Sequence, residues 1–255
     1  MILTAENYFS KEAQMAYMGA SQFKSFCECE AKAMAEIKGE FESPPTDSML
    51  VGSYIDAHFS NELHLFTAKH PEILTKAGEL KAPYQKANEI IWRISQDNVF
   101  MQHISGKMQV IMTGVINEVE YKIKIDSLLQ DMTVDLKVMK DFEYCWKDGE
   151  RLPFYEAWGY NYQAAIYQAV RAQNDGEIKP FILAAATKEK EPDLKLFMFD
   201  DAYLRQSFEK ICTLSPRFAA IKKGFIEPTR CGVCDFCKRT KTLKQGEYEI
   251  IGGSE

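Results

Sequence analysis

The chain has 255 residues and a formal net charge of −6, and hydrophobic residues make up 46% of it. This length suits one large domain or two small ones, and the hydrophobic content argues against intrinsic disorder. The acidic balance excludes a surface coated with basic charge, although a locally basic cleft for nucleic acid is compatible with it. The sequence has no run of 18 apolar residues, so we expect no membrane span.

The N-terminal stretch MILTAENYFSKEAQ is polar and lacks the apolar region of a signal peptide. We therefore expect a cytoplasmic protein. In a reducing compartment, the seven cysteines are expected to be free thiols or metal ligands and not disulfides.

The first part of the chain has a helical pattern. An amphipathic helix is predicted from Ser21 to a stop at Gly39, followed by helical segments over residues 48–69 and 82–104. The hydrophobic pattern changes at residue 109. Over residues 109–139, apolar residues alternate with polar ones or occur in short runs, and many side chains are β-branched. This segment predicts three strands in a meander.

The second part of the chain alternates helices and strands. After a predicted loop come a helix over 154–173, strands over 181–188 and 195–200, and a helix over 200–224 that is expected to break near Pro216. The element order predicts an α/β fold, with a mixed central sheet flanked by helices and a helical N-terminal wing. We expect a single domain over 1–255, with a cysteine-rich tail over 225–242.

The stretch IDSLLQDMTVDLKVMK places two acids and a lysine in a predicted hairpin. Asp135 and Lys137 are two residues apart on one strand and therefore share a face, and Asp126 on the preceding strand could lie opposite Asp135. Paired carboxylates suit Mg²⁺ or Mn²⁺, and Lys137 could orient or deprotonate water or stabilise charge on a phosphate. On this motif alone, edge-strand charges or a salt bridge are about equally compatible.

Further polar residues occur in a fixed order around this hairpin. His58 lies in the predicted helix GSYIDAH, and Gln163 and Tyr167 share one face of a later helix. Together with the hairpin, this set resembles the PD-(D/E)xK nuclease superfamily. It is most similar to phage and prophage exonucleases of the RecE type, with kinship to RecB-type nuclease domains, over residues 18–242.

The resemblance implies a restriction-endonuclease-like core and a role for each of these residues. Asp126 and Asp135 would hold the metal with help from His58, Lys137 would be catalytic, and Gln163 and Tyr167 would position the DNA. Two departures from the family pattern are an Asp in place of the frequent Glu before x-Lys, and Ile in place of Pro before Asp126.

The resemblance also implies the reaction and its context. It predicts a Mg²⁺-dependent exonuclease that digests linear double-stranded DNA, 5′ to 3′, in phage-type recombination. Such an enzyme would form a ring-shaped homo-oligomer and work with a single-strand annealing protein of the RecT type.

The tail sequence CGVCDFC supplies three thiolates, Cys231, Cys234 and Cys237, within seven residues. Soft thiolates suit Zn²⁺ or an iron–sulfur cluster, and either normally needs a fourth ligand, for which Cys29 or its neighbour Cys27 is available. The resemblance to RecB-like nucleases with one N-terminal and three C-terminal cysteines favours a [4Fe–4S] cluster over Zn²⁺. The alternative is a turn that packs three free thiols.

Two other functions are compatible with the sequence. One is an iron–sulfur single-strand exonuclease or a repair endonuclease of the same superfamily, and the other is a non-catalytic DNA-binding module. The intact Asp126, Asp135 and Lys137 argue against the second, while Glu62 or Glu79 could add a metal ligand. Basic residues near the predicted active face are candidates for DNA contacts: Lys122, Lys124, Lys137, Lys140, Arg171, Lys188 and Lys190.

Overall fold

The computed structural model describes all residues except 148, 249–250 and 252–255. A mixed sheet forms its centre, with the strand order β1-β2-β3-β6-β7. Strands β3 and β6 are parallel and the other neighbours are antiparallel, which confirms the predicted mixed sheet. The strands are β1 (Lys107–Ile116), β2 (Val119–Leu128), β3 (Thr133–Met139), β6 (Phe181–Thr187) and β7 (Leu194–Met198).

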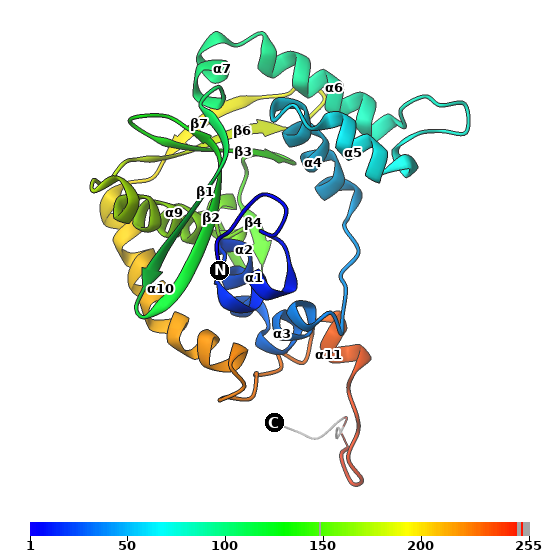
Figure 1. The fold of residues 1–255 in the computed structure, drawn as a ribbon. Helices are drawn as coiled ribbons and strands as arrows, with labels where there is room; N and C mark the ends of the chain where they lie inside the picture. Colours follow the sequence, from blue (N-terminus) through cyan, green and yellow to red (C-terminus); the bar gives the residue numbers. More distant parts are fainter. Residues whose placement is uncertain (148, 249–250, 252–255) are drawn as a thin grey trace.

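Helices cover both faces of this sheet (Figure 1). One face packs against α4 (Asp47–Phe59), α6 (Ala82–Ser95) and α7 (Asn98–Ile104), with α5 (Leu63–Lys69) and the short η1 (Pro71–Ile73) beside them. The other face packs against α2 (Ala20–Glu28), α3 (Glu30–Lys38), α9 (Tyr160–Asp175) and α10 (Asp201–Lys222). Among the described residues, no helix has both the length and the apolar character of a membrane span.

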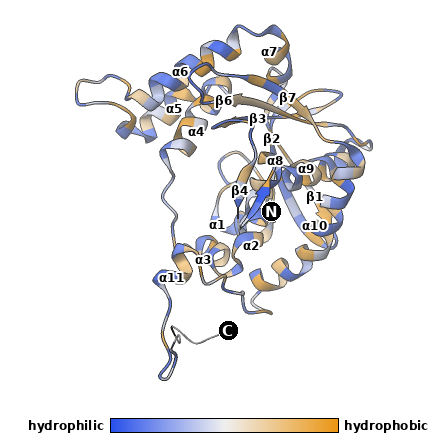
Figure 2. Cartoon of the chain, turned by 180° about the vertical axis from the view of Figure 1, so that it is seen from behind, coloured by the Kyte–Doolittle hydropathy of each residue, from blue (hydrophilic) through white to orange (hydrophobic). Residues whose placement is uncertain are grey.

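Strand β6, inside the sheet, is the most deeply buried of its strands. Every residue of β6, FILAAAT, is buried, because helices cover the strand from both sides. Figure 2 shows β6 and β7 in the hydrophobic colour between helices of mixed polarity. The small alanines of β6 leave room beside β3, which carries charged residues.

Several predicted helices are divided in the structure. The helix expected to run to Gly39 splits at Cys29, whose extended φ of −162° separates α2 from α3. Gly39 does end α3, in the left-handed conformation at φ 75°. Between α4 and α5, Asn61 takes a left-handed φ of 61° and turns the chain.

Helix α10 continues through Pro216, so the predicted break is wrong. Proline has no N–H to donate to the carbonyl of the residue four positions earlier, which here is Cys212. The side-chain amide of Asn117, in the β1–β2 turn, donates to that carbonyl at 2.8 Å. This bond replaces the missing helical one.

The remaining elements are short. They are α1 (Lys11–Ala16), α8 (Phe154–Ala157), α11 (Asp235–Arg239) in the tail, and the strands β4 (Cys145–Lys147) and β5 (Glu150–Leu152). Strands β4 and β5 form a separate two-stranded hairpin inside the segment predicted as a loop.

Candidate active site

Two carboxylates lie where strands β2 and β3 separate. The two strands pair only at Ser127–Val134 and Leu128–Thr133, and continued pairing would place Asp126 opposite Asp135. At that point β3 continues along β6, while β2 follows β1. The Leu136 N–H, which has lost its strand partner, donates to Asp126 Oδ2 at 3.2 Å.

Lys137 contacts both carboxylates. Its Nζ lies 2.6 Å from Asp135 Oδ2 and 3.8 Å from Asp126 Oδ2. The Asp135 side chain is only 2% exposed, and its Oδ1 accepts a hydrogen bond of 2.7 Å from Gln163 Nε2. Apart from this contact with Lys137, Asp135 Oδ2 has no hydrogen-bond partner among the described residues.

The charges of this cluster influence one another strongly. Burial raises the pKa of Asp126 well above its usual range, Asp135 raises it further, and Lys137 opposes both. Burial tends to lower the pKa of Lys137, but Asp135 and then Asp126 outweigh it and raise that pKa. A divalent cation fits this oxygen-rich set, since it would offset the repulsion between the carboxylates.

Helix α9 supports the cluster from one side. Gln163 and Tyr167 are one turn apart on its buried face, and Gln163 holds Asp135 as described. The Tyr167 hydroxyl donates to the Lys124 carbonyl of β2 at 2.9 Å. One helix face therefore contacts both strands that carry the acids, although Tyr167 touches backbone and not a carboxylate.

A third acid, which was not predicted, interacts electrostatically with this cluster. Burial raises the pKa of Asp56 on α4, while Lys137 lowers it and Asp135 raises it, so these groups are close enough to interact. His58 is two residues further along the same helix and therefore points to a different side. Its ring lies edge-on to Phe59, and among the described residues His58 does not form a close group of possible metal ligands with Asp126 and Asp135.

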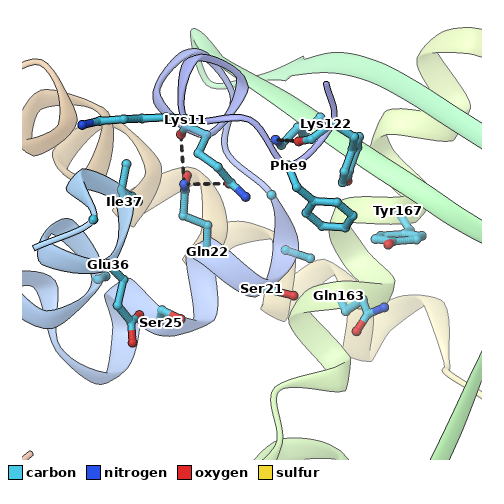
Figure 3. A pocket seen from close by; sticks show the side chains of 16 residues that line it. Phe9, Lys11, Ser21, Gln22, Ser25, Glu36, Ile37, Lys122, Gln163 and Tyr167 are labelled. Carbon is cyan, nitrogen blue, oxygen red and sulfur yellow. Dashed lines mark hydrogen bonds between the residues drawn. The ribbon is translucent and has the colours of Figure 1, made fainter. Parts of the chain in front are cut away.

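A cavity of about 510 Å³ opens beside Gln163 and Tyr167 (Figure 3). The N-terminal segment closes one side of it with Phe9, and α2 and α3 line the rest. Figure 3 shows Phe9 next to Tyr167 and Lys122, with the polar Gln22 across the cavity. A cavity of this size can hold a nucleotide.

Several basic residues expected to contact DNA are engaged within the protein. The Lys122 ammonium is buried and donates to the Tyr8 carbonyl. Arg171 is buried against Asp175 and the carbonyls of the β2–β3 turn, and Lys188 donates to Ser48. These contacts are structural.

The remaining candidate cations are closer to solvent. Lys124 lies 5.3 Å from the ring centroid of Phe9, and Lys140 is 94% exposed beside Asp141. The carbonyl of Lys190 accepts a hydrogen bond from Lys86.

The four cysteines Cys29, Cys231, Cys234 and Cys237 converge, with all sulfur atoms within 4.8 Å of one another. The sulfurs of Cys29 and Cys237 are 3.6 Å apart, and those of Cys231 and Cys237 are 3.9 Å apart. The structure thus selects Cys29 as the fourth thiol, while Cys27 is exposed and outside the group. The N–H groups of Cys234 and Val233 lower the pKa of Cys231, which favours its thiolate.

These sulfur distances match a single metal ion closely. A tetrahedral zinc site with Zn–S bonds of about 2.3 Å has sulfur–sulfur edges of about 3.8 Å. In an iron–sulfur cube each thiolate binds a different iron, so the thiolates stand farther apart. The donor set suits both groups, and its compactness favours Zn²⁺.

Comparisons with known proteins agree with this architecture. Residues 19–240 match the family model described as a PDDEXK-like domain of unknown function. No curated protein matches the chain. A solved structure from Eubacterium rectale, described as a "putative exonuclease", is 42% identical over 96% of this chain and 95% of that one, with a TM-score of 0.91.

Proposed function

Because the chain belongs to the family of PD-(D/E)xK-like domains, we propose that it is a metal-dependent DNA exonuclease. The observation that carries this proposal is the meeting of Asp126, Asp135 and Lys137 at the point where β2 and β3 separate. This arrangement provides the carboxylates and the cation needed to hydrolyse a phosphodiester bond.

Each residue of the cluster has a proposed role. Asp126 and Asp135 would hold Mg²⁺ or Mn²⁺, with Asp56 as a further acid nearby. When bound, the metal would polarise a phosphoryl oxygen and lower the pKa of water. Lys137, kept protonated by its two carboxylates, would stabilise negative charge on the phosphate.

Gln163 would hold Asp135 in the orientation that turns Oδ2 toward Lys137. Tyr167 would fix β2 through the Lys124 carbonyl and would border the substrate at the adjoining cavity. Both are positioning residues in this account.

Action at DNA ends is supported by the cavity beside α9 and by the likeness to the solved protein from Eubacterium rectale, whose description names an exonuclease. A cavity of nucleotide size next to the cluster suits a terminal nucleotide better than the middle of a continuous duplex. Digestion of double-stranded ends in the 5′ to 3′ direction, within a phage-type recombination system, follows from the resemblance to RecE-type exonucleases.

We also propose that the four cysteines hold a metal centre. The resemblance to RecB-like nucleases favours a [4Fe–4S] cluster, and the sulfur distances favour Zn²⁺. Reduced thiols of this kind suit a cytoplasmic protein. A ring-shaped homo-oligomer and a single-strand annealing partner complete the proposal, both from the resemblance.

The proposed end-directed activity is tested with two forms of one plasmid. Purified protein with Mg²⁺ is expected to release nucleotides from the linear duplex and to leave the covalently closed circle intact. Labels on opposite ends of the two strands would report the direction. Equal cleavage of the closed circle would instead identify an endonuclease of the same superfamily.

A further inference from the structure

A second cavity, of about 640 Å³, is bordered by three of the four clustered cysteines and by the residues that precede α9. One wall includes Trp158, an indole that is 56% exposed although it precedes a well-packed helix. Lys24 and Lys147 line the same space, and Cys29 and Cys231 form its far end. The catalytic roles proposed above do not use this cavity.

The cations of the cavity lie next to aromatic rings. The ammonium of Lys147 is 6.0 Å from the ring centroid of Trp158, and that of Lys24 is 5.4 Å from the ring centroid of Tyr160. An exposed aromatic face beside an ammonium is the combination that binds a nucleotide, because the base stacks while the cation meets the phosphate.

Lys24 connects this cavity to the catalytic cluster. Its Nζ donates to the Trp158 carbonyl at 3.3 Å, and its side chain crosses Gly159, where an added Cβ would lie 2.6 Å from Lys24 Cδ. Burial lowers the pKa of Lys24 to about 8, and Lys137 and Asp135 both act on it. Lys24 thus contacts the chain at the start of α9, the helix whose Gln163 holds Asp135.

The acids around the cavity leave Lys24 available. Glu28 is paired with Lys147 at 2.8 Å, and Glu156 accepts a hydrogen bond of 2.7 Å from Tyr203. In the part of the chain that the structure describes, Lys24 forms no ion pair. The half-buried ammonium of Lys24 therefore lacks an anionic partner, and a bound anionic ligand would supply one.

We propose that this cavity holds an unpaired nucleotide of the DNA strand that enters the catalytic site, with its base against Trp158 and its phosphate at Lys24. The ligand is single-stranded DNA, because the bases of a duplex already stack on one another and present no free face. This inference rests on the proposed nuclease function, and it assigns that site a path for the substrate strand.

The test uses the fact that the chain has three tryptophans, Trp92, Trp146 and Trp158. Fluorescein-labelled oligothymidylate is titrated into the full-length protein without divalent cations, so that binding is measured without hydrolysis. Trp158→Ala is expected to raise the Kd at least about fivefold, since stacking contributes 1–3 kcal/mol per base by alanine substitution. Trp92→Ala, at an equally exposed indole on α6, is the matched control.

Two further measurements separate stacking from a general loss of structure. Unlabelled oligothymidylate should quench tryptophan fluorescence, and Trp158→Phe should retain binding while losing the quenching. Lys24→Gln should weaken binding and reduce the slope of log K against log salt by about one. A blunt duplex of the same length should produce no quenching of Trp158.

The inference is overturned if Trp158→Ala binds like Trp92→Ala, or if quenching persists in Trp158→Phe. Its failure is distinct from failure of the proposed function, because binding is measured without catalysis. Trp158-dependent binding without Mg²⁺-dependent hydrolysis would contradict the nuclease proposal alone. Hydrolysis with Trp158-independent binding would contradict only the nucleotide site.

Discussion

Asp135 is held by two different partners, one at each oxygen. Gln163 fixes Oδ1 by a hydrogen bond, whereas Oδ2 faces Lys137 without a well-oriented bond. A buried carboxylate that an amide holds at one oxygen and an ammonium at the other has a fixed orientation, which a metal ligand requires.

The role of Lys137 is tested by Lys137→Gln, which removes the charge and keeps most of the side-chain volume. We expect the kcat for nucleotide release to fall at least about a hundredfold, with little change in KM, because the charge acts on the reacting phosphate. Initial rates over a range of DNA concentrations provide both constants. Lys140→Gln, at an exposed lysine on the same segment, is the control, and equal rates for the two variants would exclude this role.

Strand periodicity in the sequence predicted which residues of the hairpin lie close together. The i and i+2 relation of Asp135 and Lys137, and the position of Asp126 across the hairpin, bring these three residues together as expected. Asp56 was missed, although an acid within the apolar helical stretch VGSYIDAHF was an available signal. The roles of Arg171 and Lys188 were not predictable, because their partners include backbone oxygens distant in sequence.

At the scale of elements, the divergence of β2 from β3 creates the site. Arg171 on α9 fixes the turn between these strands, donating to the carbonyls of Leu129 and Gln130 and to Thr133 Oγ1. Its side chain is 2% exposed. The helix that holds Asp135 through Gln163 therefore also holds the hairpin that carries Asp126.

We expect Arg171→Met to lower the free energy of unfolding by about 2 kcal/mol, since it removes the hydrogen bonds to Thr133 and to the partly buried turn carbonyls and the ion pair with Asp175. Urea denaturation followed by circular dichroism measures this change. Arg205→Met, at an exposed position of α10, should change it by less than about 0.5 kcal/mol. A loss for Arg171→Met no larger than that of this control would show that the buried guanidinium does not stabilise the turn.

The sequence predicted which segments form the sheet and which form its helices. It predicted less well where a helix is interrupted and where it continues. The period of 2 in residues 109–139 and the helical period before it predicted the sheet and the helical wing. The break between α2 and α3 at Cys29, and the continuation of α10 through Pro216, both depend on contacts between residues distant in sequence. Cys29 meets the tail thiols there, and Asn117 satisfies the carbonyl that Pro216 frees.

At the scale of the whole molecule, the C-terminal tail is fastened to the start of the chain. Besides the four cysteines, Glu30 on α3 receives two hydrogen bonds from Arg217, at 2.7 and 2.8 Å, and one from the Thr229 N–H at 2.7 Å. The proposed metal centre would join the same two regions. Because the second cavity ends at these cysteines, the centre would also form a wall of the proposed nucleotide site.

Cys29→Ser is expected to remove the metal from the tail site and to lower the thermal midpoint of unfolding, because metal binding contributes directly to folding. Cys27→Ser, at an exposed cysteine outside the group, should leave both unchanged. Elemental analysis of anaerobically purified protein would identify iron or zinc. Stoichiometric metal that survives in Cys29→Ser but is lost in Cys27→Ser would contradict the assignment of the fourth ligand.

The central claim is that the carboxylates at the β2–β3 separation hydrolyse DNA with a divalent metal. The most direct measurement is nucleotide release from linear duplex DNA by Asp135→Ala, with Asp131→Ala, an exposed acid in the adjoining turn, as the control. We expect Mg²⁺-dependent release by the wild type and by Asp131→Ala, and loss of at least about a hundredfold in Asp135→Ala and in EDTA. Undiminished release by a folded Asp135→Ala would contradict the account.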